Sequence, residues 1–423
     1  MLDQNGLRTI HAIKKEQERS EVSKPDPRPE DLVPKTYHKH LKVFSKKESE
    51  CMPVRKPWNH AIDMKDIFVP KKERLIPLSL QEQKEVSNFI DDQTKKGYIR
   101  PSKSPQTSPV FFVPKKDGKK RMVQDHHYLS EHTVKNNYPL PLIQQLSEKL
   151  QGAKLFTKMD LCWEYNNIRI KEGDEWKAAF TCHQGSFKPL VMYFGLCNSP
   201  ATFQAMMKKI FTNMEDIMVV YVDDLLIFTK TDNQEEHDKI VLEVLRWLKE
   251  HDLFVKPEKC FFWVKEVEFL GMTISAKGIK MNDDKVQAIL EWPTAKTVRG
   301  VCSFLGLANF YWRFIKDYAQ VTHPLNDLTK KDQTFKWKEP QQIAFDTLKQ
   351  KFTTAPILAF PDMDKQFRLK TDASEFTTRA VLSILKDDKE HPVAYSSHSM
   401  LPKECNYPIA DKEMLSVIQS LKE

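Results

Sequence analysis

The chain has 423 residues, 40% of them hydrophobic, which is enough for two to four domains with substantial cores, and its net charge of +8 is a mild basic excess. Its N-terminus is polar and no apolar stretch approaches the ~20 residues needed to cross a membrane, so we expect a soluble, intracellular protein. The seven cysteines include no C-x-x-C pair, which argues against a disulfide framework and against a structural zinc site.

The first 70 residues are polar and rich in proline, as in "SKPDPRPEDLVP", and this composition predicts an extended leader or linker. Regular structure is predicted to begin with a helix over residues 80–96. Ser79 and Glu82 form a capping-box pattern, and Gly97 suits the position after the last turn.

A basic hairpin is predicted next, in "SPVFFVPKKDGKKRMVQD". Two apolar runs, 110–113 and 122–123, flank the turn signal Asp117-Gly118. Five lysines and arginines surround this turn, and such a concentration of positive charge indicates phosphate binding.

Two aspartates interrupt the apolar run "VVYVDDLLIF", which predicts a hairpin with Asp223-Asp224 at its turn. A third, Asp160, ends the predicted strand "KLFTKMD". Between them, "SPATFQAMMKKIFTNM" is predicted to be a helix, with Ser199 as its N-cap and Pro200 at its first position. Beyond the hairpin we expect a helix over residues 233–252, strands over 254–275, helices over 283–355 with caps at Thr297 and Pro340, and a fresh sheet from residue 367.

An aspartate pair at a turn is by itself weak evidence, since Asp is common in turns. If three carboxylates gather, each pair at ~4 Å costs roughly 4 kcal/mol at an effective dielectric of ~20. Divalent cations compensate for such repulsion, and Mg²⁺ prefers carboxylate and phosphate oxygens. Two such ions form the clamp used in nucleotidyl transfer. We therefore predict that Asp160, Asp223 and Asp224 hold metal, provided that the fold brings them together.

A set of ordered motifs carries a family resemblance: "FTKMDL", "YFGLCNSPATFQ", "YVDD", "KPEKC", "EFLGMTIS" and "SFLGLANFYWRFI". Together they resemble the reverse transcriptase of gypsy-type (Metaviridae) LTR retrotransposons. "DEWKAAFTCHQGSF" and "PVAYSSHSM" are similar to its chromovirus-like, fungal branch. The resemblance implies an α+β right-hand polymerase followed by a truncated RNase H-like α/β segment. It implies a leader (1–70), fingers with part of the palm (71–150), a palm with the primer grip (151–284), thumb or connection helices (285–358) and the start of an RNase H-like domain (359–423).

The resemblance also implies roles for single residues. Asp160, Asp223 and Asp224 match the metal-binding catalytic triad. The matches to dNTP-binding residues are Lys116, Arg121, Tyr165, Phe194 and Gly195, with Tyr165 as the gate that excludes a ribose 2′-hydroxyl. The matches to template- and primer-binding residues are Gln204, Leu270 and Gly271. The implied activity is RNA-directed DNA polymerisation with two Mg²⁺ ions, for which Mn²⁺ can substitute.

The implied partners are an RNA template, a DNA primer or RNA–DNA hybrid, dNTPs, and the upstream protease and downstream RNase H and integrase segments of a polyprotein, without a membrane. The implied location is a cytoplasmic virus-like particle, the nucleus, or both. In the RNase H-like remnant, Asp372 and Glu413 match two of four metal-binding carboxylates, and we expect no nuclease activity because the other two are absent.

The sequence departs from the family pattern at several positions. Glu164 replaces a glycine beside Tyr165, His126 and His127 replace Tyr-Arg, and Arg379 replaces a glycine of the RNase H pattern; Cys302, Trp312 and Cys405 stand where arginine is common. His126 and His127 lack a second ligand pair at zinc spacing, so we assign no zinc site. The Arg and Gly replacements are all reachable by single transitions. An alternative hypothesis is therefore a decaying, catalytically impaired relic that keeps only the fold and nucleic-acid binding.

Overall fold

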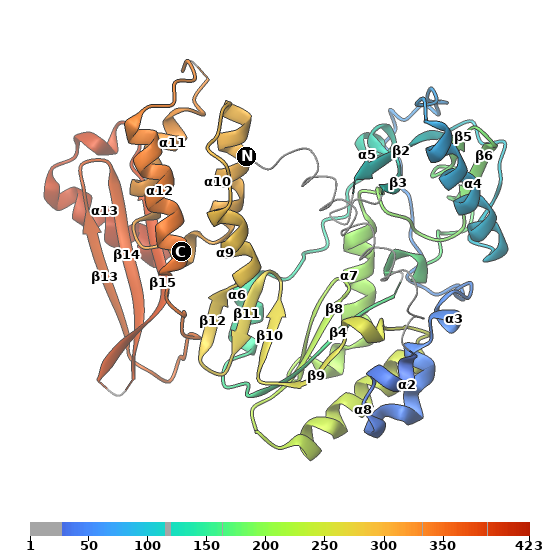
Figure 1. Ribbon diagram of the computed structural model, residues 1–423, viewed down its shortest axis with the longest axis horizontal. Helices are drawn as coiled ribbons and strands as arrows, with labels where there is room; N and C mark the ends of the chain where they lie inside the picture. Colours follow the sequence, from blue (N-terminus) through green and yellow to red (C-terminus); the bar gives the residue numbers. More distant parts are fainter. Residues whose placement is uncertain (1–27, 115–119, 163, 332, 387) are drawn as a thin grey trace, which may run out of the picture.

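The structure is a computed structural model that describes residues 28–423, except 115–119, 163, 332 and 387, and except the side chains of residues 143, 144, 147 and 164. Lys116 and the turn Asp117-Gly118 therefore lie outside the described residues. The described strands form four sheets with helices packed on them (Figure 1); the first two sheets are interleaved in sequence, and the other two follow along the chain.

The segment before residue 70 is folded from Arg28 onward, which corrects the predicted leader. It forms α2 (Pro29–Leu32), the 3₁₀ helix η1 (Lys35–Phe44) and α3 (Lys46–Ser49). Tyr37 and Phe44 are completely buried in the core beneath this arm. The Tyr37 hydroxyl donates to Asp238, which also accepts from Trp263 Nε1 at 2.7 Å. This N-terminal arm, residues 28–49, is rich in prolines and lysines, which made it resemble a leader. Its fold depends instead on the burial of the two aromatic side chains, Tyr37 and Phe44.

A five-stranded sheet in the order β1-β6-β5-β2-β3 contains the predicted basic hairpin. Its strands are β1 (Ile99–Pro101), β2 (Ser108–Pro114), β3 (Lys120–Gln124), β5 (Phe180–Cys182) and β6 (Gly185–Pro189). The helix α4 (Leu80–Lys95) packs Val86 and Ile90 against it, and the capping box of Ser79 and Glu82 is present as predicted. Gly97 follows with φ +74°, a conformation that suits glycine. The helices α5 (His127–His132) and α6 (Ile143–Lys149) lead away from the sheet.

A four-stranded antiparallel sheet in the order β7-β8-β4-β9 carries the predicted acidic residues. Its strands are β4 (Leu155–Asp160), β7 (Met218–Tyr221), β8 (Asp224–Thr229) and β9 (Phe261–Val264). The helices α7 (Ser199–Ile210) and α8 (Gln234–Glu250) share a core with one face, through Met159, Leu225 and Ile227. Alternation puts Phe156 and Leu226 into a second core on the other face, so the strands are held on both sides.

The N-cap of α7 is Asn198, which corrects the prediction of Ser199. The amide of Asn198 accepts from Asn136 N and donates to Val134 O, at 3.0 and 2.8 Å, so it does not cap the helix. Pro200 lies in the first turn, where a missing N–H costs nothing.

A three-stranded sheet, β10 (Glu266–Phe269), β11 (Met272–Ser275) and β12 (Gly278–Met281), leads into a helical region. Its helices are α9 (Asp283–Leu290), α10 (Val298–Phe310), the short η5 (Trp312–Phe314), α11 (Tyr318–Asp327) and α12 (Glu339–Thr353). Thr297 caps α10 as predicted, with its side chain accepting from Gly300 N at 3.1 Å. The N-cap of α12 is Lys338 and Pro340 lies in its first turn, which corrects the predicted cap.

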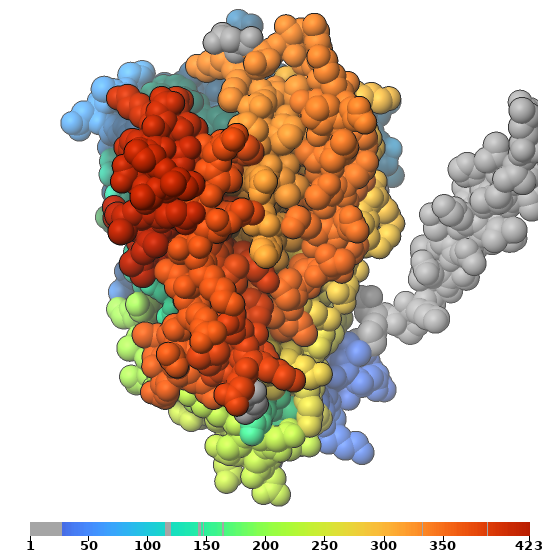
Figure 2. Space-filling model, turned by 90° about the vertical axis from the view of Figure 1, so that its left-hand side faces the viewer, coloured from blue at the N-terminus to red at the C-terminus, as the bar shows by residue number. Residues whose placement is uncertain are grey.

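The last part of the chain is an antiparallel sheet, β13 (Phe367–Ala373), β14 (Thr377–Lys386) and β15 (Lys389–Ser399). A 3₁₀ turn, η6 (Glu404–Asn406), and the helix α13 (Ile409–Lys422) follow, and α13 lies against β13 and β14. Figure 2 shows that the orange and red segments at the end of the chain form one continuous outer face. Within the described residues, no helix has the length and apolar character that a membrane crossing requires.

Candidate active site

The three predicted metal ligands lie at the same end of the four-stranded sheet. Asp160 is the last residue of β4 and stands directly opposite Asp224, the first residue of β8. The turn residue Asp223 is joined to the same strand end, since its carbonyl accepts from Leu161 N at 3.0 Å. Antiparallel pairing of two apolar strands thus brings together carboxylates that are more than 60 residues apart in sequence.

Lysines provide the counter-charge at this strand end. Lys256 Nζ lies 2.5 Å and Lys259 Nζ 3.0 Å from the carboxylate oxygens of Asp160, which is 8% exposed. Lys158 Nζ lies 3.2 Å from Asp224 Oδ1. Burial, followed by the charges of Asp223 and Asp160, raises the pKa of Asp224 against the opposing effect of Lys158. The carboxylates are therefore electrostatically crowded, as three neighbouring acids should be.

The donor set fits a divalent cation in type and charge, because three residues that offer hard carboxylate oxygens lie at the same strand end. As the side chains stand, no group of three or more acidic, histidine or cysteine side chains among the described residues converges closely enough to hold a metal ion. The carboxylates of Asp160 and Asp224 instead point toward lysines. The backbone thus brings the three residues to one place, while the side chains are engaged in ion pairs.

The turn that carries Asp223 is held by a buried glutamine of α7. Gln204 Oε1 accepts from Val222 N at 2.8 Å and its Nε2 donates to Val220 O at 3.2 Å. Val222 has φ +51°, a costly conformation for a β-branched residue. The sequence resemblance gave Gln204 a contact with the template; in the structure its side chain is 3% exposed and engaged with this turn.

Gln204→Leu is expected to lower the free energy of unfolding by about 1–3 kcal/mol, because Val222 N–H then lacks its acceptor. Urea unfolding measures this effect. Gln204→Glu keeps the acceptor for Val222 and should lose less stability; an unchanged free energy of unfolding in Gln204→Leu would contradict this role.

Three of the predicted dNTP-binding residues form a row of contacts. The Arg121 guanidinium lies 4.4 Å from the centre of the Phe194 ring, and the Tyr165 ring meets Phe194 edge-on at 4.8 Å between centroids. Phe194 is 40% exposed, so the row is open to solvent. The fourth, Gly195, has φ +103°, and a Cβ there would lie 3.3 Å from Gln124 O, so only glycine fits without strain. Lys116 and the side chain of Glu164 are outside the described part of the chain.

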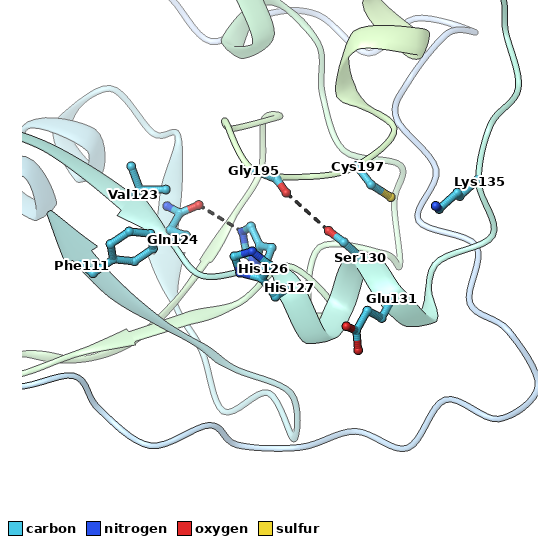
Figure 3. Close-up of a pocket in the computed structure, with 10 residues that line it drawn as sticks. All are labelled: Phe111, Val123, Gln124, His126, His127, Ser130, Glu131, Lys135, Gly195 and Cys197. Carbon is cyan, nitrogen blue, oxygen red and sulfur yellow. Dashed lines mark hydrogen bonds between the residues drawn. The ribbon is translucent and has the colours of Figure 1, made fainter. Parts of the chain in front are cut away.

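A cavity of about 450 Å³ adjoins Gly195 (Figure 3). It is lined by residues of β2, β3, α5 and the segments that flank α5 and follow Phe194, namely Phe111, Val123, Gln124, His126, His127, Ser130, Glu131, Lys135, Gly195 and Cys197. Burial lowers the pKa of His126 to about 4, and its ring nitrogens meet Ser108 and Gln124. His127 is exposed and its pKa is raised by its hydrogen bond to Asp125. From the sequence, both histidines were identified only as departures from the family pattern. The cavity could not be predicted, because no local pattern shows that residues 124–131 lie next to residues 195–197.

The predicted primer-grip residues form the turn between β10 and β11. Leu270 and Gly271 have φ +51° and +78°, the pattern of a type I′ hairpin turn. The hydroxyl of Tyr311, just after α10, donates to Gly271 O at 2.7 Å. A Cβ at Gly271 would lie 3.3 Å from this hydroxyl and 3.6 Å from Phe310 Cε1. Sequence reasoning missed these two aromatic residues, because their motif is 40 residues away from the turn that they support.

In the C-terminal sheet, the two predicted remnant residues lie close to each other. The Asp372 carboxylate forms an ion pair with Arg379 on the neighbouring strand. Glu413 of α13 accepts from Ala373 N, next to Asp372, at 3.3 Å. Both carboxylates are thus engaged within the chain.

Two family models match the chain. The model described as "Reverse transcriptase (RNA-dependent DNA polymerase)" matches residues 113–274, and the model of the "RNase H-like domain found in reverse transcriptase" matches residues 337–423. Together with the fold, they show that the chain belongs to the reverse transcriptase family.

Within this family the chain is similar to gypsy-type elements of a fungus. It is 41% identical to the Transposon Tf2-3 and Tf2-7 polyproteins of Schizosaccharomyces pombe over 351 residues. The match covers 82% of this chain and 26% of each relative, so the chain spans about a quarter of the length of the curated relatives.

Solved structures share the fold. The foamy viral protease-reverse transcriptase in complex with RNA/DNA hybrid has a TM-score of 0.81 at 23% identity, covering 94% of this chain and 53% of that chain. The form named dRH, in complex with double-stranded DNA, has a TM-score of 0.83 at 24% identity, covering 94% of this chain and 69% of that chain. The α+β polymerase fold followed by an RNase H-like segment, predicted from the sequence, is thereby confirmed.

Proposed function

We propose that the chain is the RNA-directed DNA polymerase of an LTR retrotransposon and adds dNTPs to a primer 3′-hydroxyl. The observation that carries the proposal is the meeting of Asp160, Asp223 and Asp224 at one strand end. Apolar cores on both faces of the sheet hold these three mutually repelling acids in place. Such crowding calls for cations.

Asp160, Asp223 and Asp224 would hold two Mg²⁺ ions, or Mn²⁺ in their place. Bound there, the ions would lower the pKa of the primer hydroxyl and offset the charge of the leaving pyrophosphate. Lys256 and Lys259 keep Asp160 charge-compensated when it is not ligating, so they favour a folded metal-free state. Loading the site then requires that Asp160 turns away from these two lysines.

The row of Arg121, Phe194 and Tyr165 supports a dNTP site. The guanidinium of Arg121 would contact the triphosphate, for which it is suited by its charge and planar fork of donors. The Tyr165 ring, fixed edge-on by Phe194, would exclude a ribose 2′-hydroxyl. Gly195 leaves room for the nucleotide, and Lys116 would add a second positive charge.

The regions 71–150, 151–284 and 285–358 would act as fingers, palm and thumb around the nucleic acid. The turn Leu270-Gly271 would grip the primer, and α7 would lie along the template side. The foamy viral relatives were solved with RNA/DNA hybrid and double-stranded DNA, which supports the same ligands here. The curated relatives are polyproteins, which supports protease and integrase neighbours and an intracellular location, in a virus-like particle or the nucleus.

The test is primer extension on poly(rA)·oligo(dT) with Mg²⁺, alongside binding of the same labelled duplex. Extension that stops in Asp223→Asn is the expected result. Binding without extension would instead favour the impaired relic. In that case, Glu164→Gly with His127→Arg should restore extension if those departures cause the impairment; tight binding with no gain in this variant would end the polymerase proposal for this copy.

Arg121→Ala is expected to raise the KM for dNTP about tenfold or more, since a charge-assisted contact to phosphate contributes ~1.5–3 kcal/mol. Steady-state extension at varied dTTP measures this effect. Arg100→Ala, an exposed arginine of β1 in the same sheet, is the matched control and should leave the KM unchanged. An equal rise of the KM for dNTP in both variants would mean that Arg121 acts only through the overall positive charge of the sheet.

The RNase H-like segment is proposed to lack nuclease activity. The side chains of Asp372 and Glu413 are engaged in contacts within the chain, with Arg379 and with the backbone of Ala373. Strong Mn²⁺-dependent cleavage of an RNA–DNA hybrid by this chain would contradict the proposal.

A further inference from the structure

Arg379 of β14 stands where the RNase H pattern has glycine, and its side chain fills the place in front of Asp372. The two residues are directly opposite each other on β13 and β14. Arg379 Nη2 forms an ion pair with Asp372 Oδ2. Glycine could not make this contact, so the counter-ion of Asp372 is specific to the arginine.

The same guanidinium also reaches another part of the chain. Arg379 Nη1 lies 3.5 Å from Asp317 Oδ1 and 3.4 Å from Gln320 Oε1. Asp317 is the N-cap of α11, and Gln320 lies in the first turn of that helix. The Arg379 side chain therefore connects the C-terminal sheet with the helical region that precedes it. Ser397 Oγ of β15, which accepts from Ala319 N at 2.8 Å, adds a second link to the same turn.

The conformation of the Arg379 side chain leaves one of its N–H groups without a hydrogen bond, which is energetically unfavourable. Its Nε is buried without a hydrogen-bond partner in the described structure. A side chain that could swing freely into solvent would satisfy this N–H with water. Because Nε stays buried, we infer that the contacts of Nη1 and Nη2 determine the position of the Arg379 side chain.

A divalent ion does not fit at Asp372 in this arrangement. The carboxylate that would ligate it is paired with a fixed positive charge, and a cation placed there would be repelled at short range. The other remnant acid, Glu413, is engaged by a backbone N–H. The family assignment of residues 337–423 implies an RNase H-like metal site, whereas the residues present oppose one.

We propose that Arg379 replaces a metal ion as the counter-ion of Asp372 and bridges the RNase H-like sheet to α11. This bridge holds the sheet of β13, β14 and β15 in a fixed position against α11. The inference concerns the fold of this chain and holds whether or not the chain polymerises DNA.

The experiment uses the full chain with Asp160→Asn and Asp224→Asn as a common background, so that Mn²⁺ bound at the four-stranded sheet does not obscure the result. Mn²⁺ binding is followed by the electron paramagnetic resonance signal of the free ion. Arg379→Met should tighten Mn²⁺ binding about tenfold or more, and adding Asp372→Asn should abolish this gain. No gain in Arg379→Met would overturn the counter-ion role.

Hydrogen exchange at residues 317–322 tests the bridge in the same proteins. Arg379→Met should speed exchange in this first turn of α11 at least about fivefold, and Asp317→Asn should have a similar, non-additive effect. Arg379→Lys keeps the charge but loses the fork, so it should still oppose Mn²⁺ while α11 exchanges faster. This conservative variant keeps the test decisive if Arg379→Met does not fold.

The matched control is Arg368→Met. Arg368 of β13 pairs with Glu390 at 2.7 Å on the same sheet but has no contact to α11 among the residues described. It should change neither Mn²⁺ binding nor exchange in α11. Unchanged exchange in Arg379→Met, or an equal change in Arg368→Met, would overturn the bridge.

Discussion

Asp224→Asn should reduce primer extension by roughly 10³-fold or more while leaving the protein equally stable or more stable at neutral pH. The loss of activity is expected because Asp224 is one of the three proposed metal ligands. The unchanged or raised stability is expected because its carboxylate is crowded by Asp160 and Asp223. Activity and stability should thus change in opposite directions, as they do at sites that store electrostatic strain.

The sign of the pH effect follows from the raised pKa of Asp224, which burial causes first and the two neighbouring aspartates increase. A carboxyl with a higher pKa in the folded state holds its proton more tightly when folded. Its stabilising contribution is complete below the unfolded pKa and is lost as the pH rises through the folded pKa. The ionised carboxylate therefore opposes folding at pH 7, and asparagine removes this opposition.

Urea unfolding of both proteins between pH 4 and 8 measures the effect. The stability of Asp224→Asn relative to the parent should increase with pH. Asp216→Asn, an exposed aspartate shortly before β7, is the control and should show neither the loss of extension nor the pH trend. If Asp224→Asn became less stable as the pH rose, the ion pair with Lys158 would outweigh the crowding, and the electrostatic account of the site would be wrong.

Gly278→Ala should lower the free energy of unfolding by roughly 3 kcal/mol. Gly278 has φ +133°, a conformation closed to side chains, and an added Cβ would collide with the carbonyl of Leu358. That carbonyl accepts from Ile279 N at 2.8 Å, in the bridge that joins β12 to the segment after α12. The substitution therefore strains the backbone and separates this bridge.

Gly306→Ala is the matched control for this prediction. Gly306 lies within the helix α10, and a Cβ there meets nothing within 4 Å. Its replacement should be neutral or stabilise by up to about 1 kcal/mol, because alanine is the better helix former. Urea unfolding of both variants measures the two changes in the free energy of unfolding. Similar decreases in Gly278→Ala and Gly306→Ala would show that movement of the chain relieves the collision at Leu358.

The Asp160 strand and the Asp223-Asp224 hairpin were predictable because each is a local pattern. Runs of apolar, β-branched residues specify strands, and an acidic break specifies a turn. The capping box at Ser79 and the glycine after α4 are equally local. What the apolar runs could not specify is their pairing: the register that puts Asp160 opposite Asp224 depends on packing against α7 and α8 on one face and a second core on the other.

The errors have the same origin. The N-terminal arm was predicted to be a leader because it contains many prolines and lysines and few apolar residues. Tyr37 and Phe44 nevertheless pack into a core formed by residues far along the chain. Ser199 has the better capping side chain, but Asn198 is held by contacts to residues 134 and 136 that no local pattern reveals.

By itself the sequence determined the order of elements, the acidic residues and the family. Only the tertiary structure decided which polar and charged groups meet: Lys256 and Lys259 at Asp160, Gln204 at the turn, and Arg379 between Asp372 and α11. The physical reason is range. Propensity and turn chemistry act over a few residues, whereas ion pairs and buried hydrogen bonds depend on side chains that folding brings together from far along the chain.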